Sequence, residues 1–151
     1  PPAPWSNVIG NPHGGFLVTE RGAGCMWAEN AFFYRVTPWH NDPVSDPTSD
    51  LLFLKDLDTG ALWSATPAPI DDGRYLVRHG AGESTFEHEH DGIHTMLHLG
   101  MPDDAAATAQ QLFAVLREFD AQGVKLIWIE TLPPEPEWDG VRDRLARASA
   151  T

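Results

Sequence analysis

The sequence predicts an α+β fold, in which an antiparallel β-sandwich is followed by an α-β-α unit. Across residues 1–103, short segments rich in aromatic and β-branched residues alternate with turns that contain glycine and proline. Asp91-Gly92 is a two-residue turn of the kind that joins neighbouring antiparallel strands. Beyond residue 103, apolar residues recur at helical spacing instead. We therefore expect two units, residues 1–103 and residues 104–151.

The strands expected in the first unit are all short, and turn residues separate them. Because a small set of short strands leaves unpaired edges, this unit is expected to associate with a second copy or to be closed by other elements. The expected strands are residues 16–19, 25–27, 32–36, 51–56, 61–64, 74–79, 84–90 and 93–99.

The second unit begins where Asp103 or Asp104 can cap a helix, and Gly123 stands where a helix would end. Residues 124–130 are apolar enough to predict a strand buried on both faces, and residues 138–148 predict a second helix. The first helix carries one apolar stripe, formed by Ala109, Leu112, Phe113, Leu116 and Phe119.

Composition excludes several classes of partner. The 151 residues are 42% hydrophobic and carry a net charge of −12, which argues against nucleic acid and against anionic membrane surfaces. No apolar run is long enough to span a bilayer. A single cysteine, Cys25, excludes an internal disulfide and favours a reducing compartment such as the cytoplasm. The chain starts at Pro1 without methionine, which predicts a fragment, a processed product or an engineered chain.

Residues 37–47 form the most distinctive stretch. Three prolines stiffen it, and its asparagine and aspartates favour Asx-type turns, so it is expected to be a rigid loop between strands. One interpretation is a structural connector whose Trp39 packs on the core. The other is a carbohydrate-binding loop, in which Trp39 offers a stacking surface and Asn41, Asp42 and Asp46 offer planar polar groups.

Five histidines crowd into residues 79–98. On a strand, His88 and His90 share one face, and His94 on the facing strand is expected to complete a three-histidine metal site. The alternative is a half-exposed strand whose histidines titrate near neutral pH. No cofactor is expected. Carboxylate pairs such as Asp42 with Asp46 are interpreted as solvated, so no catalytic residue is assigned.

Residues 4–103 resemble the N-terminal domain of cellobiose and chitobiose phosphorylases and cyclic β-1,2-glucan synthases. The resemblance implies that the strands open a larger β-supersandwich. It further implies that the general acid and the phosphate-binding residues lie in an α/α-barrel that follows this domain. The matching motifs are PWSNV at 4–8, GAG at 22–24, WAEN at 27–30, RVTPWHNDPVSDP at 35–47, LFLKDLDTG at 52–60, WSATP at 63–67 and VRHGAGESTFEH at 77–88.

Residues 105–149 resemble something different, the C-terminal tail of threonylcarbamoyl-adenylate synthases. The chain is accordingly expected to be a chimera or a fusion of two fragments, joined near residues 101–104. The matching residues are LFAVLREFDAQG at 112–123, Glu130, Pro133, Pro134, Trp138 and RDRL at 142–145.

These observations support three hypotheses about function. The first is a non-catalytic structural or assembly module, derived from a carbohydrate-active enzyme and forming homo-oligomers. The second is a weak module that binds β-glucan oligosaccharides through Trp39, Asn41, Asp42 and Asp46. The third is an enzyme with a metal held by His88, His90 and His94.

Overall fold

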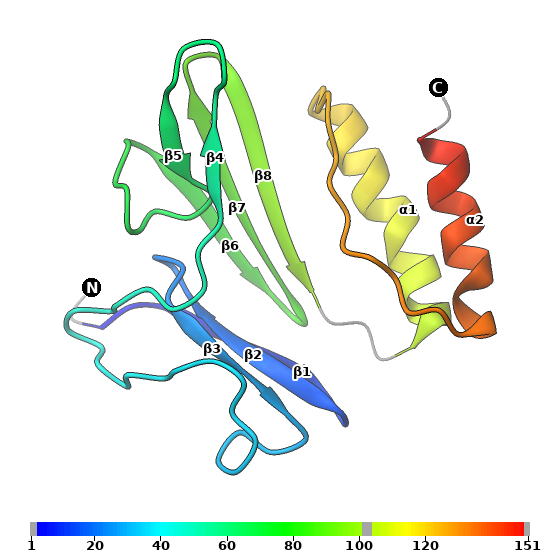
Figure 1. Cartoon of the computed structure of the whole chain (residues 1–151), viewed down its shortest axis with the longest axis horizontal. Coiled ribbons are helices and arrows are strands. Elements are labelled where there is room, and N and C mark those ends of the chain that lie inside the picture. The colour runs from blue at the N-terminus through cyan, green and yellow to red at the C-terminus, as the bar shows by residue number, and fades with distance from the viewer. Residues whose placement is uncertain (1–2, 101–103, 150–151) are drawn as a thin grey trace. The chain divides into compact units, whose positions relative to one another are not determined.

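A computed structural model of the chain describes residues 3–100 and 104–149. The chain separates into two compact units, Pro1–Met101 and Pro102–Thr151. The first is built of antiparallel strands and the second of helices (Figure 1). The α+β fold class predicted from the sequence is confirmed.

The described strands of the first unit form three small antiparallel sheets. The first sheet has the order β1-β2-β3, the second pairs β4 with β5, and the third has the order β6-β7-β8. The strands are β1 (Ser6–Asn11), β2 (Gly14–Thr19), β3 (Gly24–Ala28), β4 (Phe53–Lys55), β5 (Leu62–Ser64), β6 (Tyr75–Gly80), β7 (Glu83–His90) and β8 (Ile93–Gly100).

The turn between β7 and β8 confirms the hairpin predicted at Asp91-Gly92. Both residues have positive φ, 47° and 78°, as a two-residue turn that matches the strand twist requires. The turn fixes the register, in which His90 pairs with Ile93 and Glu89 with His94. Because paired residues point to the same face of a sheet, this register decides which histidines can meet.

The core of the first unit is organised by β7, in which buried residues alternate with half-buried or exposed ones. Ser84, Phe86 and His88 point inward and are at most 3% exposed. The side-chain amide of Asn7 on β1 donates to the backbone carbonyl of Glu83 at 2.8 Å and to the hydroxyl of Ser84 at 3.0 Å. These bonds attach the first sheet to the third.

In the first unit one predicted strand is absent, and one strand of the structure was not predicted. Residues 32–36 are not a strand; only an isolated bridge joins Arg35 to Trp27. Asn30 accepts hydrogen bonds from the amides of Phe32 and Phe33, so a local turn takes the place of a ladder. Conversely, β1 was not predicted, because Pro4, Asn7 and Gly10 interrupt the strand signal and only pairing with β2 makes it regular.

The second unit contains α1 (Ala105–Ala121), a 3₁₀ turn η1 (Pro136–Trp138) and α2 (Asp139–Ala148). Asp104 caps α1 as predicted and accepts a hydrogen bond from the amide of Ala107 at 2.7 Å. Gly123 follows the helix with a φ of 71°, which suits glycine beyond a C-cap. From the apolar stripe Phe119 is buried, and Val141 of α2 is buried as well.

The strand predicted at residues 124–130 is not formed. The segment is extended but irregular, and Leu126, Trp128 and Ile129 are exposed rather than buried on both faces. An isolated extended segment gains no ladder hydrogen bonds, and no strand is described elsewhere in residues 104–149 to pair with it. No helix in the described parts of the chain is long and apolar enough to cross a membrane.

The burial of Phe86 predicts a large stability effect. Replacing Phe86 by Ala should lower the free energy of unfolding by about 3–5 kcal/mol, because it removes buried apolar surface and leaves a cavity. Leu76→Ala is the matched control, since Leu76 lies on neighbouring β6 but is 49% exposed. It should cost about 1 kcal/mol or less. Urea unfolding followed by tryptophan fluorescence measures both, and equal losses would contradict the central place of Phe86.

Candidate functional site

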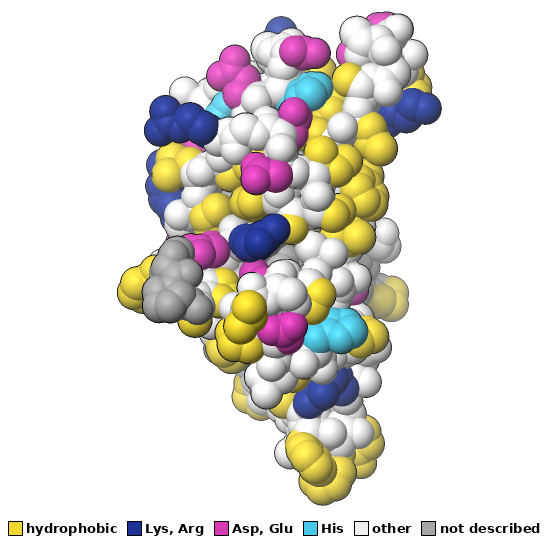
Figure 2. All heavy atoms as spheres, turned by 90° about the vertical axis from the view of Figure 1, so that its left-hand side faces the viewer, with side chains coloured by type: hydrophobic (Ala, Val, Ile, Leu, Met, Phe, Trp, Pro, Cys, Tyr) yellow, Lys and Arg dark blue, Asp and Glu magenta, His cyan; other side chains and the backbone are white. Residues whose placement is uncertain are grey.

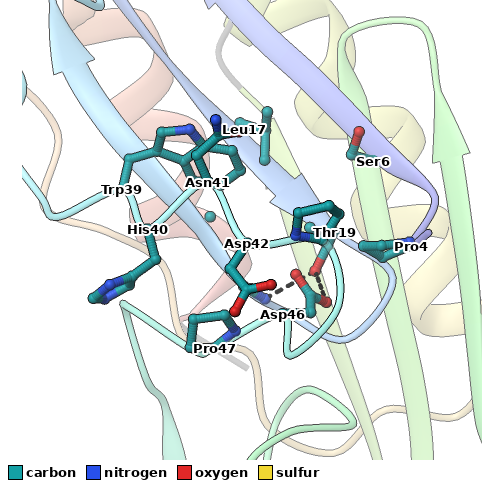
Figure 3. A pocket seen from close by; sticks show the side chains of 13 residues that line it. Pro4, Ser6, Leu17, Thr19, Trp39, His40, Asn41, Asp42, Asp46 and Pro47 are labelled. Carbon is teal, nitrogen blue, oxygen red and sulfur yellow. Dashed lines mark hydrogen bonds between the residues drawn. The ribbon is translucent and has the colours of Figure 1, made fainter.

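A pocket lies where the loop of residues 37–47 covers one end of the first sheet (Figure 3). Its volume is about 160 Å³. All four residues predicted to bind carbohydrate line it, namely Trp39, Asn41, Asp42 and Asp46. The strands and the segments beside them supply the remainder of the wall, including Pro4, Ser6, Leu17, Thr19, Ala23 and Gly24.

A buried hydrogen bond anchors the loop to the sheet. The hydroxyl of Thr19, at the end of β2, donates to Oδ2 of Asp46 at 2.8 Å and accepts from the amide of Ala23 at 3.0 Å. Asp46 is only 6% exposed, so the interpretation of this carboxylate as solvated is wrong. Its backbone has a φ of 43°, and the Thr19 bond helps to hold that conformation.

Asp42 instead faces solvent and organises the loop locally. Its carboxylate accepts the amides of Val44 at 2.9 Å and Ser45 at 3.2 Å, and the hydroxyl of Ser45 at 2.5 Å. The Ser45 hydroxyl contributes most to lowering the pKa of Asp42 below its ordinary value, followed by the Ser45 and Val44 amides. The carboxylate is therefore charged near neutral pH, and hydrogen bonds from Val44 and Ser45 of the same turn use part of its capacity to accept.

Trp39 and Asn41 complete the mouth of the pocket. Trp39 is half-buried, and Asn41 is exposed with a φ of 50°. Just before them, the hydroxyl of Thr37 accepts the amide of Met26 at 2.8 Å, which fixes the start of the loop to β3. Sequence reasoning missed Ser6, Leu17 and Thr19 as pocket residues, because nothing in their local pattern distinguishes them from other strand residues.

The histidines are arranged differently from the prediction. His88 and His90 lie on the same face of β7 as predicted, and they converge with Asp72 rather than with His94. His94 pairs with Glu89, whose side chain points to the opposite face. Donor atoms of Asp72, His88 and His90 all lie within 4.8 Å of one another.

Aromatic rings flank this cluster. Trp63 stacks on His90 with ring centroids 4.6 Å apart, and Tyr75 stacks on His88 at 4.0 Å. The Tyr75 hydroxyl donates to the carbonyl of Ser64 at 2.8 Å. Burial raises the pKa of Tyr75 above its ordinary value, so this hydroxyl stays protonated at neutral pH.

Comparison with known proteins places the first unit in a family. Residues 1–113 match the family model described as "Glycosyl hydrolase 94, supersandwich domain". The cyclic beta-(1,2)-glucan synthase NdvB of Rhizobium meliloti (strain 1021) is 35% identical over 102 residues, which are 63% of this chain and 4% of that protein. The N,N'-diacetylchitobiose phosphorylase of Vibrio proteolyticus is 29% identical over 105 residues, which are 67% of this chain and 13% of that protein.

The chain belongs to glycosyl hydrolase family 94 through its supersandwich domain. A second N,N'-diacetylchitobiose phosphorylase, from Vibrio furnissii, is 30% identical over 96 residues. The resemblance of the first unit to the N-terminal domain of these enzymes is thus confirmed. The chain spans 13% or less of the length of each of these relatives.

The hydrogen bonds to Asp42 predict that its pKa depends on Ser45. Ser45→Ala should move the pKa of Asp42 back toward its ordinary value, because it removes the donor that contributes most to the shift. In the wild type the pKa is lowered on folding, so the turn is stabilised at neutral pH. That stabilisation is lost as pH falls through the folded-state pKa.

The measurement is an NMR titration of the Asp42 side chain in both proteins. Ser49→Ala is the control, because the Ser49 hydroxyl donates to the carbonyl of Gly24 and not to Asp42. An unchanged Asp42 pKa in Ser45→Ala would show that the turn is not held as described.

Proposed function

We propose that this chain acts as a non-catalytic structural module of a carbohydrate-active enzyme system, and that it assembles with further copies of itself. The observation that carries the proposal is the match of residues 1–113 to the supersandwich domain of glycosyl hydrolase family 94. A module of this kind needs surfaces on which other parts of an assembly pack.

Exposed apolar side chains in the first unit support such assembly. Phe32 and Phe33 are 79% and 75% exposed and contact each other edge to face, with ring centroids 5.0 Å apart. Figure 2 shows several groups of hydrophobic side chains on one face of the molecule. Burial of such surface contributes roughly 25 cal/mol per Å². Other exposed apolar residues of the first unit include Val36, Leu51, Leu52, Phe53 and Leu62.

The sheets also have open edges. In the described residues, β1, β6 and β8 each pair with a strand on one side only, whereas residues 34–37 cover part of the outer edge of β3. Unpaired strand edges offer hydrogen-bonding groups to a second chain.

We propose that a second copy of this chain covers the Phe32–Phe33 surface, because two identical surfaces can bury one another symmetrically.

Light scattering over a range of concentrations tests this assembly. The wild type should be a dimer or larger, and Phe33→Asp should shift the mass toward that of a monomer. Leu126→Asp is the control, since Leu126 is 67% exposed but belongs to the second unit. A monomeric wild type at all concentrations, or equal effects of the two substitutions, would contradict self-association through this surface.

A second candidate function is weak binding of β-glucan oligosaccharides in the pocket beneath the loop. The specific observation is that Trp39, Asn41 and Asp42 line one pocket. An aromatic face stacks on the apolar face of a sugar ring, and amide and carboxylate groups bond its hydroxyls. The pocket is smaller than the roughly 300–1,000 Å³ of typical ligand sites, which suits one sugar ring rather than a long chain.

Within that pocket the two aspartates have different roles. Asp46 is buried and accepts the Thr19 hydroxyl, so it holds the loop in place. Asp42 and Asn41 are exposed and can reach a sugar hydroxyl directly. The names of the relatives, which refer to a β-(1,2)-glucan and to N,N'-diacetylchitobiose, guide the choice of sugars to test.

Titration with cello- and sophoro-oligosaccharides, followed by tryptophan fluorescence, tests the second candidate. The wild type should show a saturable change that Trp39→Ala abolishes and Asn41→Ala weakens about ten-fold, which corresponds to roughly 1.4 kcal/mol. Trp128→Phe should retain the change, because Trp128 lies in the second unit. A saturable response that persists in Trp39→Ala would place the sugar elsewhere.

Two further inferences concern origin and location. We propose that the second unit derives from a different protein family, similar to the C-terminal tail of threonylcarbamoyl-adenylate synthases. The division of the chain into two compact units between Met101 and Pro102 supports this origin. The match to the supersandwich family extends beyond that division into α1. We also propose a cytoplasmic location. The support is that Cys25 is a free thiol, and free cysteines are usual in reducing compartments.

A further inference from the structure

In the cluster of Asp72, His88 and His90, three side chains that can bind a metal ion lie close together. Asp72 lies in the loop before β6, and both histidines lie on the inner face of β7. The His88 side chain is 1% exposed, that of His90 is 18% exposed, and that of Asp72 is 32% exposed. The cluster is thus closed on the His88 side and open to solvent on the Asp72 side.

The hydrogen bonding of His88 determines which of its nitrogens is free. Nδ1 lies 3.1 Å from the backbone carbonyl of Arg74, which can only accept, so Nδ1 carries a proton. In a neutral imidazole, Nε2 then keeps its lone pair. This buried Nε2 has no hydrogen-bond partner among the described residues, and it lies 3.6 Å from Oδ2 of Asp72.

A lone pair facing a carboxylate at this distance is unfavourable unless a positive charge lies between them. Two donors bound to one tetrahedral Zn²⁺, each at about 2.0–2.1 Å, lie about 3.4 Å apart. The observed 3.6 Å between Nε2 and Oδ2 fits this geometry. Nδ1 of His90 contacts the same Oδ2 through a direct hydrogen bond, which a bound ion would replace, and donor atoms of all three residues lie within 4.8 Å of one another. They are of the nitrogen and oxygen types that zinc prefers.

The surroundings supply His88 with the outer hydrogen bond that metal-binding histidines usually have. The Arg74 carbonyl orients His88 through Nδ1, whereas Nε2 of His90 has no hydrogen-bond partner among the described residues and lies 3.7 Å from Oδ2 of Asp91. Stacking on Tyr75 and Trp63 restrains both imidazoles. Rings held in this way lose little freedom when they bind an ion.

We propose that Asp72, His88 and His90 bind a divalent transition-metal ion of the Zn²⁺ type, with Nε2 of His88, Nδ1 of His90 and a carboxylate oxygen of Asp72 as ligands. The ion ties the loop before β6 to β7. The proposal concerns metal binding in the first unit and does not depend on the proposed assembly or sugar-binding functions.

The test is a titration of the full chain, freed of metal by a chelator, with Zn²⁺ against a competing indicator and with Co²⁺ followed by visible absorption. The wild type should bind one ion per chain, give the Co²⁺ absorption of a four-coordinate site and unfold at a higher temperature with Zn²⁺. His90→Gln and Asp72→Asn should each weaken binding ten-fold or more.

His94→Gln is the matched control, because His94 lies on neighbouring β8 and pairs with Glu89 on the other face. It should bind Zn²⁺ like the wild type. Near-UV circular dichroism, which reports on the packing of the aromatic side chains, checks that each variant is folded, and Asp72→Asn keeps the shape of the side chain. The proposal is overturned if the folded wild type binds no ion stoichiometrically, if Asp72→Asn and His90→Gln both bind as well as the wild type, or if His94→Gln loses the site.

Discussion

The first unit depends on the inner face of one strand, β7. Ser84, Phe86 and His88 point inward from it, and the polar side chains of Ser84 and His88 connect it to other parts of the unit. Ser84 bonds Asn7 of the first sheet and His79 of β6, while His88 bonds the backbone at Arg74. Because these contacts need strict alternation of buried and exposed residues, a slip of one residue in the β7 register would break all of them together.

The same strand explains why polar residues are buried in so small a core. The eight strands described in the first unit are short and form three small sheets, so the core that they enclose is small. Side chains that combine an apolar body with hydrogen-bonding groups, such as His88 and Tyr75, fill the space and connect the sheets. Each such group needs a partner, and among the described residues four buried ring nitrogens have none: Nε1 of Trp63 and Nε2 of His79, His88 and His90.

The loop of residues 37–47 uses its two aspartates in different ways. Asp46 is buried and holds the loop to β2 through Thr19, whereas Asp42 is exposed and builds a turn within the loop. The pocket therefore has a rigid wall, and its exposed polar groups are not needed to hold the loop to the sheet. Rigid loops on a β scaffold are common positions for recognition, because the scaffold fixes the groups that meet a ligand.

The sequence by itself determined the elements whose signals are local. The Asp91-Gly92 hairpin, the capped helix from Asp104 to Gly123 and the stiffness of residues 37–47 follow from turn, cap and proline chemistry. The pocket residues of that loop could also be named from sequence, since they are neighbours along the chain.

Tertiary structure decided what depends on distant partners. Residues 32–36 and 124–130 have strand-like composition, yet strands form only where a neighbouring strand accepts their hydrogen bonds. The contributions of Thr19 to the loop and of Asp72 to the histidine cluster join residues far apart in sequence. His94 was placed wrongly for the same reason: the face it occupies is set by its pairing with Glu89, and pairing is a property of the folded sheet.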